Sequence, residues 1–363
     1  MIKKIALLVP DLALGGGQRV ALNTAQLLAE RYDVTLVIFT DDEKLFNTDI
    51  RVINLKCTKK SSVLGKIQTI YKRVKRYKKL LKKEKFDITI SFLESANLCA
   101  FLSDRKNSIL TQHTKPELLA RFDQIVLQYL FRFSHHIIAV SAGLKDTLET
   151  SLKLKHVSVI NNPIDIPEVQ ALANIDNAAI NAKQPKRKFI VAVGRLVEVK
   201  RYDLMMDVFC KTTASNDYDL VIIGDGEDYN KLQKHIEHLP AACADKIHLI
   251  GGMENPFPII KEAELILLTS RIEAFPMVLL EALALEVPIV SYNCPAGLKD
   301  IVLNNQNGLL IENNDFDGLV NAIDKVLSNH ELRQTLKNNT LKSVQRFSPE
   351  SILNNWEKYF RKF

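Results

Sequence analysis

Two glutamates eight residues apart, Glu273 and Glu281, could hold the hydroxyl groups of a sugar. They flank a Phe-Pro dipeptide in the segment SRIEAFPMVLLEALALEVPIVSY (270–292). Pro276 suits the first turn of a helix, because its φ is fixed and it has no N–H to satisfy. Glu273 then lies in the loop before the helix, and Glu281 lies one to two turns inside it.

The start of this predicted helix could also bind an anion. The first N–H groups of a helix have no partner within it, and they favour phosphate. A loop carboxylate, a row of donors and a helix carboxylate together form a clamp for a nucleotide-sugar. The same spacing also fits a solvated Glu273 and an exposed Glu281. The backbone positions expected to face the anion are Phe275, Pro276, Met277 and Val278.

Two cations, Arg195 and Lys200, follow the apolar run FIVAVG, which is typical of a buried strand. They stand five residues apart, just beyond the predicted strand. Two cations in this place can neutralise a diphosphate and stabilise charge that develops on a leaving group. The pattern alone fits a pair of ordinary surface cations equally well.

A run of three glycines, Gly15 to Gly17, follows the first apolar run and precedes a helical pattern from Gln18 to Glu30. Glycine lets the backbone approach a ligand closely, and the helix start leaves N–H groups for phosphate or sugar oxygens. The run differs from G-x-G-x-x-G, so a dinucleotide fingerprint is not indicated.

These segments resemble the motifs of retaining glycosyltransferases of family four, the large group related to glycogen synthase. Glu273 and Glu281 match the E-x7-E signature of that family. The run G-R-L-x-x-x-K, which contains Arg195 and Lys200, matches its donor-phosphate motif. The resemblance therefore assigns these four side chains to a donor site.

Further matches extend the resemblance over nearly the whole chain. GGGQR resembles the GG-x-E/Q-R segment that follows the first strand in this family, and VIIGDGEDYNKL and IHLIGGMENP resemble the segments that line the base and ribose. SILTQHTKPE carries a histidine where family members have one near the reacting sugar. The residues that these matches add are Gly16, Gly17, Gly224, Met253 and His113.

The resemblance implies two Rossmann-like, doubly wound α/β domains facing a central cleft, the fold called GT-B. It implies metal-independent transfer, with retention, of a sugar from a nucleotide diphosphate, which we expect to be UDP. No cofactor is expected. SYNCPAGLKDIV resembles bacterial transferases that build lipopolysaccharide, capsule or lipid-linked oligosaccharides. The predicted acceptor is therefore a lipid-linked or cell-surface glycan.

The resemblance also implies a role for each site residue. Arg195 and Lys200 hold the diphosphate and stabilise the departing charge. Glu281 accepts hydrogen bonds from the ribose, and Glu273 contacts the transferred sugar. The histidine and the glycine turn of the first domain complete the pocket. Two other functions remain open, a nucleotide-sugar epimerase of the same fold and a non-catalytic partner subunit.

Short β-rich runs alternate with helical stretches along both halves of the chain, a pattern typical of βαβ units on a parallel sheet. We predict a first domain over 1–163, a linker over 164–187 and a nucleotide-sugar domain over 188–346. The last residues, 347–363, resemble the terminal helix that crosses back to the first domain. The predicted strands are KIALLVP, DVTLVIF, ITISFL, SIL, HIIAV and SVINNP, then FIVAVG, DLVIIG, IHLIG, LILLTS, PIVSY and GLLI.

Composition favours an intracellular globular protein. The chain has 363 residues, and 47% of them are hydrophobic, which is enough for two domains with substantial cores. Five scattered cysteines without C-x-x-C spacing predict a reducing compartment, with neither a disulfide framework nor a zinc site. No apolar run approaches the ~20 residues that span a bilayer, so we expect a cytoplasmic protein. Asp217 and Asp219 form a D-x-D that we interpret as a solvated turn.

Basic residues are concentrated in one segment. Between Lys56 and Lys85 there are 13 Lys or Arg and a single acid, while the whole chain carries a net charge of only +7. Attachment of a helix at 63–83 to an anionic membrane is the favoured interpretation, at about 1 kcal/mol per basic residue near the surface. A solvated helix is the alternative, and nucleic acid is not expected as a partner. The apolar face is predicted to contain Val63, Leu64, Ile67, Ile70, Tyr71, Val74, Tyr77 and Leu81.

Overall fold

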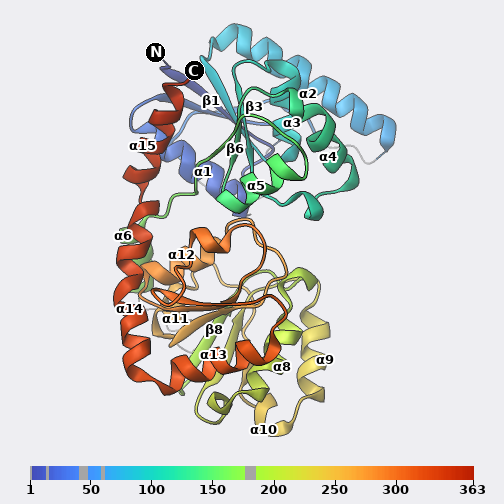
Figure 1. The fold of residues 1–363 in the computed structure, drawn as a ribbon. Helices are drawn as coiled ribbons and strands as arrows, with labels where there is room; N and C mark the ends of the chain where they lie inside the picture. Colours follow the sequence, from blue (N-terminus) through green and yellow to red (C-terminus); the bar gives the residue numbers. More distant parts are fainter. Residues whose placement is uncertain (1, 14–15, 41–47, 59–61, 176–184) are drawn as a thin grey trace. The chain divides into compact units, whose positions relative to one another are not determined.

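In a computed structural model the chain folds into two compact units (Figure 1). Unit 1 comprises Met1–Pro163 and Pro349–Phe363, and unit 2 comprises Ile164–Ser348. The structure describes residues 2–13, 16–40, 48–58, 62–175 and 185–363. Gly15 of the predicted glycine turn and residues 176–184 of the predicted linker lie outside the described residues.

Unit 1 is built on a seven-stranded sheet in which every pairing is parallel. The central strands are almost wholly buried, as expected when helices cover both faces of a parallel sheet. The chain order reverses between β1 and β4. The strands, in spatial order, are β3 (Val52–Asn54), β2 (Asp33–Ile38), β1 (Lys4–Val9), β4 (Ile88–Phe92), β5 (Ser108–Gln112), β6 (Ile137–Ala139) and β7 (Val157–Val159).

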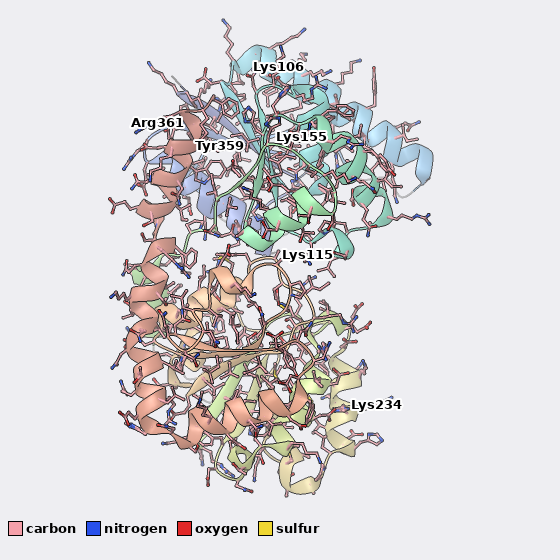
Figure 2. All side chains as sticks on the ribbon, in the orientation of Figure 1. Lys106, Lys115, Lys155, Lys234, Tyr359 and Arg361 are labelled. Carbon is pink, nitrogen blue, oxygen red and sulfur yellow. A yellow bond between two sulfur atoms is a disulfide. The ribbon has the colours of Figure 1, made fainter. Side chains whose placement is uncertain are left out.

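Helices connect these strands, and the last helix of the chain also belongs to unit 1. Tyr359 of that helix (Figure 2) is buried, and its hydroxyl lies 3.1 Å from Nδ1 of His136. Arg31 pairs with Glu357 at 2.8 Å. The helical elements of unit 1 are α1 (Gly16–Ala29), α2 (Val63–Glu84), α3 (Glu94–Ser103), η1 (Pro116–Leu118), α4 (Arg121–Ile125), η2 (Val126–Leu130), η3 (Phe131–Phe133), α5 (Ala142–Thr150) and α15 (Pro349–Phe360).

Unit 2 is a second parallel sheet, with six strands. Its order reverses between β8 and β11, so it repeats the doubly wound arrangement of unit 1. The predicted α/β class is thus confirmed in both units. The strands, in spatial order, are β10 (Ile247–Leu249), β9 (Asp219–Ile223), β8 (Phe189–Val193), β11 (Leu265–Leu268), β12 (Ile289–Tyr292) and β13 (Gly308–Ile311).

Part of the predicted linker is a helix of unit 2. α6 packs on α11 and α12, and Gln170 donates a hydrogen bond to the carbonyl of Ala284 at 3.0 Å. The helical elements of unit 2 are α6 (Ile166–Ala173), η4 (Glu198–Lys200), α8 (Tyr202–Lys211), η5 (Thr213–Asn216), α9 (Tyr229–His238), α10 (Ala241–Ala244), α11 (Phe257–Glu262), α12 (Met277–Ala284), η6 (Leu298–Asp300), α13 (Phe316–Ser328), α14 (His330–Val344) and η7 (Gln345–Phe347).

The predicted basic helix forms, but it is rotated relative to the prediction. Its buried residues are spaced by four, in the order Gly65, Thr69, Arg73 and Tyr77. The predicted apolar face is therefore wrong at Ile67 and Tyr71, which are 60% and 67% exposed. The side chains of residues 63 and 64 are not described.

Arg73 of this basic helix is only 5% exposed. Its guanidinium lies 4.1 Å from the centre of the Phe39 ring. Nε and Nη2 have no hydrogen-bond partner in the described structure. Burial lowers the pKa of the Arg73 guanidinium. Gly65 and Thr69, two small residues, lie on the same buried side of the helix as Arg73.

The prediction of no disulfide is wrong, because Cys210 of α8 and Cys243 of α10 form one. The pair is separated by 33 residues, and the fold brings its two helices together. Cys57, Cys99 and Cys294 are free and buried.

The interpretation of Asp219 as part of a solvated turn is also wrong. Asp219 is buried at the amino end of β9, where one carboxylate oxygen lies 2.9 Å from Nε2 of His248. The other lies 3.4 Å from Nε of Arg187. Asp219 therefore has a structural role away from the carboxyl edge of the sheet.

Candidate functional site

The strongest cluster of predicted site residues lies where the strand order of unit 2 reverses. Lys200 follows β8 and Glu273 follows β11, and these two strands are paired neighbours. The Lys200 ammonium lies 2.5 Å from Oε1 of Glu273, and Ser270 donates a hydrogen bond to the same oxygen at 2.6 Å. Ligands of doubly wound folds bind at such a reversal point, at the carboxyl ends of the strands.

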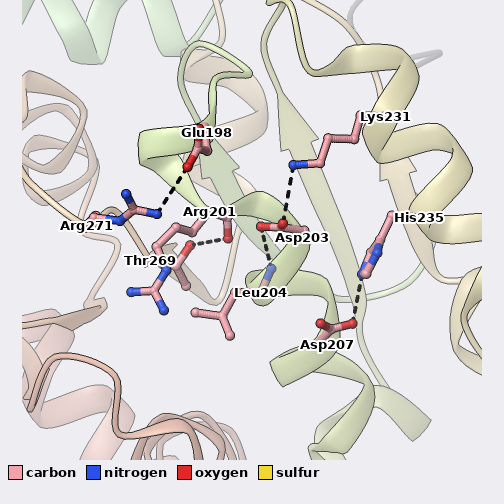
Figure 3. A network of polar contacts seen from close by, with 9 residues as sticks. All are labelled: Glu198, Arg201, Asp203, Leu204, Asp207, Lys231, His235, Thr269 and Arg271. Carbon is pink, nitrogen blue, oxygen red and sulfur yellow. Dashed lines mark hydrogen bonds and ion pairs between the residues drawn. The ribbon is translucent and has the colours of Figure 1, made fainter.

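The two loops that carry this ion pair are fastened to each other. The Thr269 hydroxyl contacts the carbonyls of Lys200 and Arg201, at 2.9 and 3.1 Å (Figure 3). Arg271 pairs with Glu198 at 3.4 Å across the same two loops. The relative position of the ammonium and the carboxylate is thus fixed by several contacts besides their own attraction.

Two uncharged groups interact with the Glu273 carboxylate, the Tyr202 hydroxyl and the Cys294 thiol. Burial, with a contribution from the Glu273 carboxylate, raises the pKa of the Tyr202 hydroxyl. The same two causes raise the pKa of the Cys294 thiol to about 12, so both groups stay uncharged at neutral pH. Lys200 and Glu273 retain side-chain exposures of 18% and 12%, so a ligand can still reach them. The motif pointed to the charged pair, whereas Ser270, Tyr202 and Cys294 had no signal in the sequence.

Glycines let the loops after β8, β9 and β10 approach one another at the same edge. The Gly194 amide donates to the carbonyl of Ile223, and the Gly224 amide donates to that of Gly251, each at 3.0 Å. A Cβ on Gly224 would lie 1.9 Å from the Gly194 oxygen, which no side chain can tolerate. Met253, predicted with Gly224 to line the donor pocket, is half-buried in the loop beyond β10.

Arg195 is exposed directly after Gly194. Among the described residues none forms an ion pair with its guanidinium, whereas Lys200 is paired with Glu273. The two predicted diphosphate ligands thus differ in how they are paired in the structure. One cation is held in place by a carboxylate, and the other is available to a bound anion.

The predicted helix after the Phe-Pro dipeptide is α12, and Pro276 lies at its N-cap. No side chain caps this end, and its first turn contains no acid, so the first N–H groups are left for a ligand. Phe275 is buried against Phe347, with ring centres 5.5 Å apart. Met277 and Val278 are half-buried at the first turn, and Glu281 is half-buried within the helix.

The predicted residues of unit 1 also lie at the carboxyl edge of its sheet. Gly16 and Gly17 begin α1 after β1, and a Cβ on Gly17 would lie 2.6 Å from the side chain of Leu93, just beyond β4. His113 follows β5 and stacks on Phe92 with ring centres 5.1 Å apart. Its Nε2 lies 2.9 Å from the Thr111 hydroxyl. Burial lowers the pKa of His113 to about 4, so its ring is neutral at physiological pH.

Sequence reasoning missed Glu94 as a candidate site residue. It begins α3 directly after β4, at the reversal point of the first sheet. Burial raises the pKa of its carboxyl, and a hydrogen bond with Thr114 partly opposes that rise. Leu93, the residue before it, has a positive φ of 69°, which holds the loop in a conformation that side chains rarely adopt. Glu94 is a candidate for hydrogen bonding to an acceptor hydroxyl.

Comparisons with known proteins agree with this geometry. Residues 14–168 match the model for glycosyltransferase family 4, and residues 174–343 match the model for glycosyl transferases group 1. The chain belongs to these two-domain glycosyltransferases. It is 24% identical, over 98% of its length and 97% of the relative, to the GalNAc-α-(1→4)-GalNAc-α-(1→3)-diNAcBac-PP-undecaprenol α-1,4-N-acetyl-D-galactosaminyltransferase of Campylobacter jejuni. It is 29% identical to the lipopolysaccharide 1,6-galactosyltransferase of Salmonella typhimurium over 54% of this chain and 53% of that one.

Solved structures show the same fold. The apo form of the lipopolysaccharide outer core galactosyltransferase WaaB superposes with a TM-score of 0.75 at 22% identity, covering 99% of this chain and all of that one. HepE of Anabaena, in complex with UDP and glucose, superposes with a TM-score of 0.79 at 18% identity, with the same coverage. The predicted GT-B fold is confirmed.

The depressed pKa of His113 predicts an acid-sensitive stability. In the unfolded chain the ring takes up a proton near its ordinary pKa of 6.5, whereas in the folded protein it does so only near 4. The folded state therefore loses stability as pH falls below 6.5, by about 2 kcal/mol at pH 5. Denaturant unfolding of wild type and His113→Gln at pH 7 and pH 5 measures this. The wild type should lose about that much more than the variant, and an equal loss in both would contradict the assignment.

Proposed function

We propose that this glycosyltransferase moves a sugar, with retention, from a UDP-sugar to a hydroxyl on a lipid-linked or cell-surface glycan. The observation that carries the proposal is the Lys200–Glu273 pair beside the exposed Arg195, at the reversal point of unit 2. A nucleotide diphosphate requires cations, and a sugar requires a positioned acceptor of hydrogen bonds. This edge of the sheet supplies both within one site.

The diphosphate is proposed to bind between Arg195, Lys200 and the start of α12. When the bond to the sugar breaks, negative charge grows on the departing phosphate. Two positioned cations and helix N–H groups stabilise this charge more than they stabilise the intact donor, and this difference lowers the barrier. The proposal requires no metal ion and no cofactor.

The two carboxylates are proposed to bind different parts of the donor. Glu281, within α12, accepts hydrogen bonds from the ribose hydroxyls. Glu273 is anchored by Lys200 and Ser270 through one oxygen, and its other oxygen is directed to the transferred sugar. In the proposed reaction the acceptor hydroxyl attacks the face of the sugar from which the phosphate leaves, and the leaving phosphate takes the proton.

The identity of the donor and the acceptor is supported by similarity. HepE, which shares the fold, was solved with UDP and glucose, and the Campylobacter relative is named for transfer to an undecaprenyl-diphosphate oligosaccharide. We propose that unit 1 binds the acceptor, with Gly16, Glu94 and neutral His113 at the edge of its sheet.

Docking on the cytoplasmic face of an anionic membrane would bring the enzyme to such an acceptor. No described helix is both long and apolar enough to cross a bilayer. α2 instead presents exposed lysines along its length, among them Lys72, Lys75, Lys79 and Lys82. Each can contribute about 1 kcal/mol near an anionic surface. We propose that α2 attracts the enzyme to that surface.

Removing either diphosphate cation should abolish turnover. We expect Arg195→Ala and Lys200→Ala each to lower kcat by about 100-fold or more, because each removes stabilisation of the leaving group. Lys188→Ala, at an exposed pair with Glu264 before β8 in the same unit, is the matched control and should stay active. Transfer assays with thermal unfolding of each variant measure this. Full activity in both variants, or loss of wild-type activity on adding EDTA, would refute the role of the cations.

Changing the carboxylates should separate nucleotide binding from turnover. Glu281→Gln should weaken UDP and the UDP-sugar alike, by about tenfold or more, because it loses charged hydrogen bonds to the ribose. Glu273→Gln should leave UDP affinity nearly unchanged and depress turnover. Titration calorimetry with UDP, paired with transfer assays, measures both effects. An equal loss of UDP affinity in the two variants would show that the roles are wrongly assigned.

Neutralising α2 should abolish electrostatic docking. We expect the variant with Lys72, Lys75, Lys79 and Lys82 changed to Gln to lose salt-sensitive binding to anionic vesicles. Arg73 and Arg76 are left intact, because Arg73 is buried and Arg76 donates to the carbonyls of Leu55 and Lys56. Vesicle co-sedimentation at low salt measures binding, and transfer to a short soluble acceptor should survive as the folding control. A wild type that ignores anionic vesicles at low salt would refute the docking role.

A further inference from the structure

Large apolar side chains are exposed along one short stretch of unit 1. The stretch runs through η1, α4, η2 and η3, residues 116–133. Five of its apolar side chains are between 46% and 58% exposed. Burying apolar area is the main driving force of folding, so a group of this kind on a surface indicates an interaction site. These residues are Leu118, Phe122, Ile125, Tyr129 and Phe133.

The opposite side of the same stretch is fixed in the core. Val126, Leu127 and Phe131 are buried, and the Phe131 ring lies 5.7 Å from that of Phe101. From residue 121 onward the exposed apolar residues are spaced by three or four, so they form one face of a helical segment. This segment is therefore apolar on two sides, and only one side is covered by the protein itself.

The N-terminal half of α2 lies beside this segment (Figure 1). Burial raises the pKa of the Asp123 carboxyl, and the nearby Lys66 ammonium partly opposes that rise. Ile67 and Tyr71, two residues of the predicted apolar face of α2, are exposed apolar side chains on that helix. Exposed cations are neighbours in the sequence of the exposed apolar residues on α2 and on this segment, namely Lys66, Lys72, Arg121 and Arg132.

We propose that this apolar face, formed by Phe122, Ile125, Tyr129 and Phe133 with Ile67 and Tyr71, inserts into the interfacial region of an anionic lipid bilayer. The inference rests on the proposed membrane docking of α2 and adds a second, apolar contribution to it. Interfacial segments combine aromatic and aliphatic side chains with basic residues, because the former enter the acyl boundary while the latter contact anionic headgroups. Both kinds of side chain occur here on adjoining elements.

The charge on α2 favours a bilayer over a second copy of the chain as the occupant. A dimer formed through this face would bring two lysine-rich helices together, and like charges repel. An anionic bilayer instead complements the lysines and covers the apolar side chains in the same event. The occupant of this face is therefore an anionic lipid bilayer.

Salt separates the apolar contribution from the electrostatic one, because salt screens charges and leaves apolar burial intact. Binding to vesicles of phosphatidylcholine and phosphatidylglycerol is measured at low and at raised salt. Wild type should keep a salt-resistant fraction, and Phe122→Ser with Phe133→Ser should lower its affinity at raised salt by about tenfold or more. Ile175→Ser, which changes an exposed apolar residue in unit 2, is the matched control and should bind as wild type does.

A fluorescent probe tests where the lipid lies. The chain contains a single tryptophan, Trp356, which is buried. Tyr129→Trp adds a second one on the proposed face, and brominated lipid in the vesicles should quench its emission. Wild type should show almost no quenching. Transfer to a short soluble acceptor should be unchanged in every variant, which shows that each one folds.

The outcomes distinguish failure of the insertion from failure of the docking. Low-salt binding that disappears completely at raised salt, with no quenching of the Tyr129→Trp variant by brominated lipid, overturns insertion and leaves docking by α2 intact. No binding at low salt overturns both. A concentration-dependent dimer that forms without lipid, and that the serine variant abolishes, assigns the face to a second copy and also overturns the proposal.

Discussion

The proposed donor site is organised around one ion pair, that between Lys200 and Glu273. The two side chains come from loops that follow β8 and β11, and these strands are neighbours because the order of the sheet reverses between them. Their 2.5 Å contact therefore depends on the strand order of the sheet in unit 2. A partly buried pair contributes less to stability than its attraction suggests, since both charges lose water. Its main effect is positional, because it holds a cation and a carboxylate together at the ligand-binding edge.

The ion pair also determines which groups of the site are available to an incoming diphosphate. While Glu273 neutralises Lys200, the exposed Arg195 is the more available cation of the site, and the uncapped start of α12 adds N–H donors. An incoming diphosphate can contact these first and then share the Lys200 ammonium with Glu273. The loops after β8 and β9 also meet at this edge of the sheet, at Gly194 and Gly224. They approach each other too closely there for Gly224 to carry a side chain. The residues that we propose for the donor site thus all lie within one unit.

Much of this was predictable from short-range patterns. The alternation of apolar runs with helical stretches indicates both sheets, and the motif spacing identifies Lys200 and Glu273. The pairing of those two side chains was not predictable, because it depends on which strands become neighbours. The same limit explains why the disulfide between Cys210 and Cys243 was not predicted. The two cysteines are 33 residues apart in the sequence, and only the fold brings them together. Helical periodicity finds α2 but not its rotation, since the buried side contains Gly65, Thr69 and Arg73, none of which belongs to the apolar pattern.

A crystal structure of the protein with bound UDP tests the central claim most directly, because it locates the diphosphate without relying on activity. The account predicts phosphate oxygens within hydrogen-bond distance of Arg195 and Lys200, next to the start of α12. It also predicts ribose hydroxyls at Glu281. A nucleotide bound to unit 1, or a diphosphate that contacts neither cation, would contradict the account.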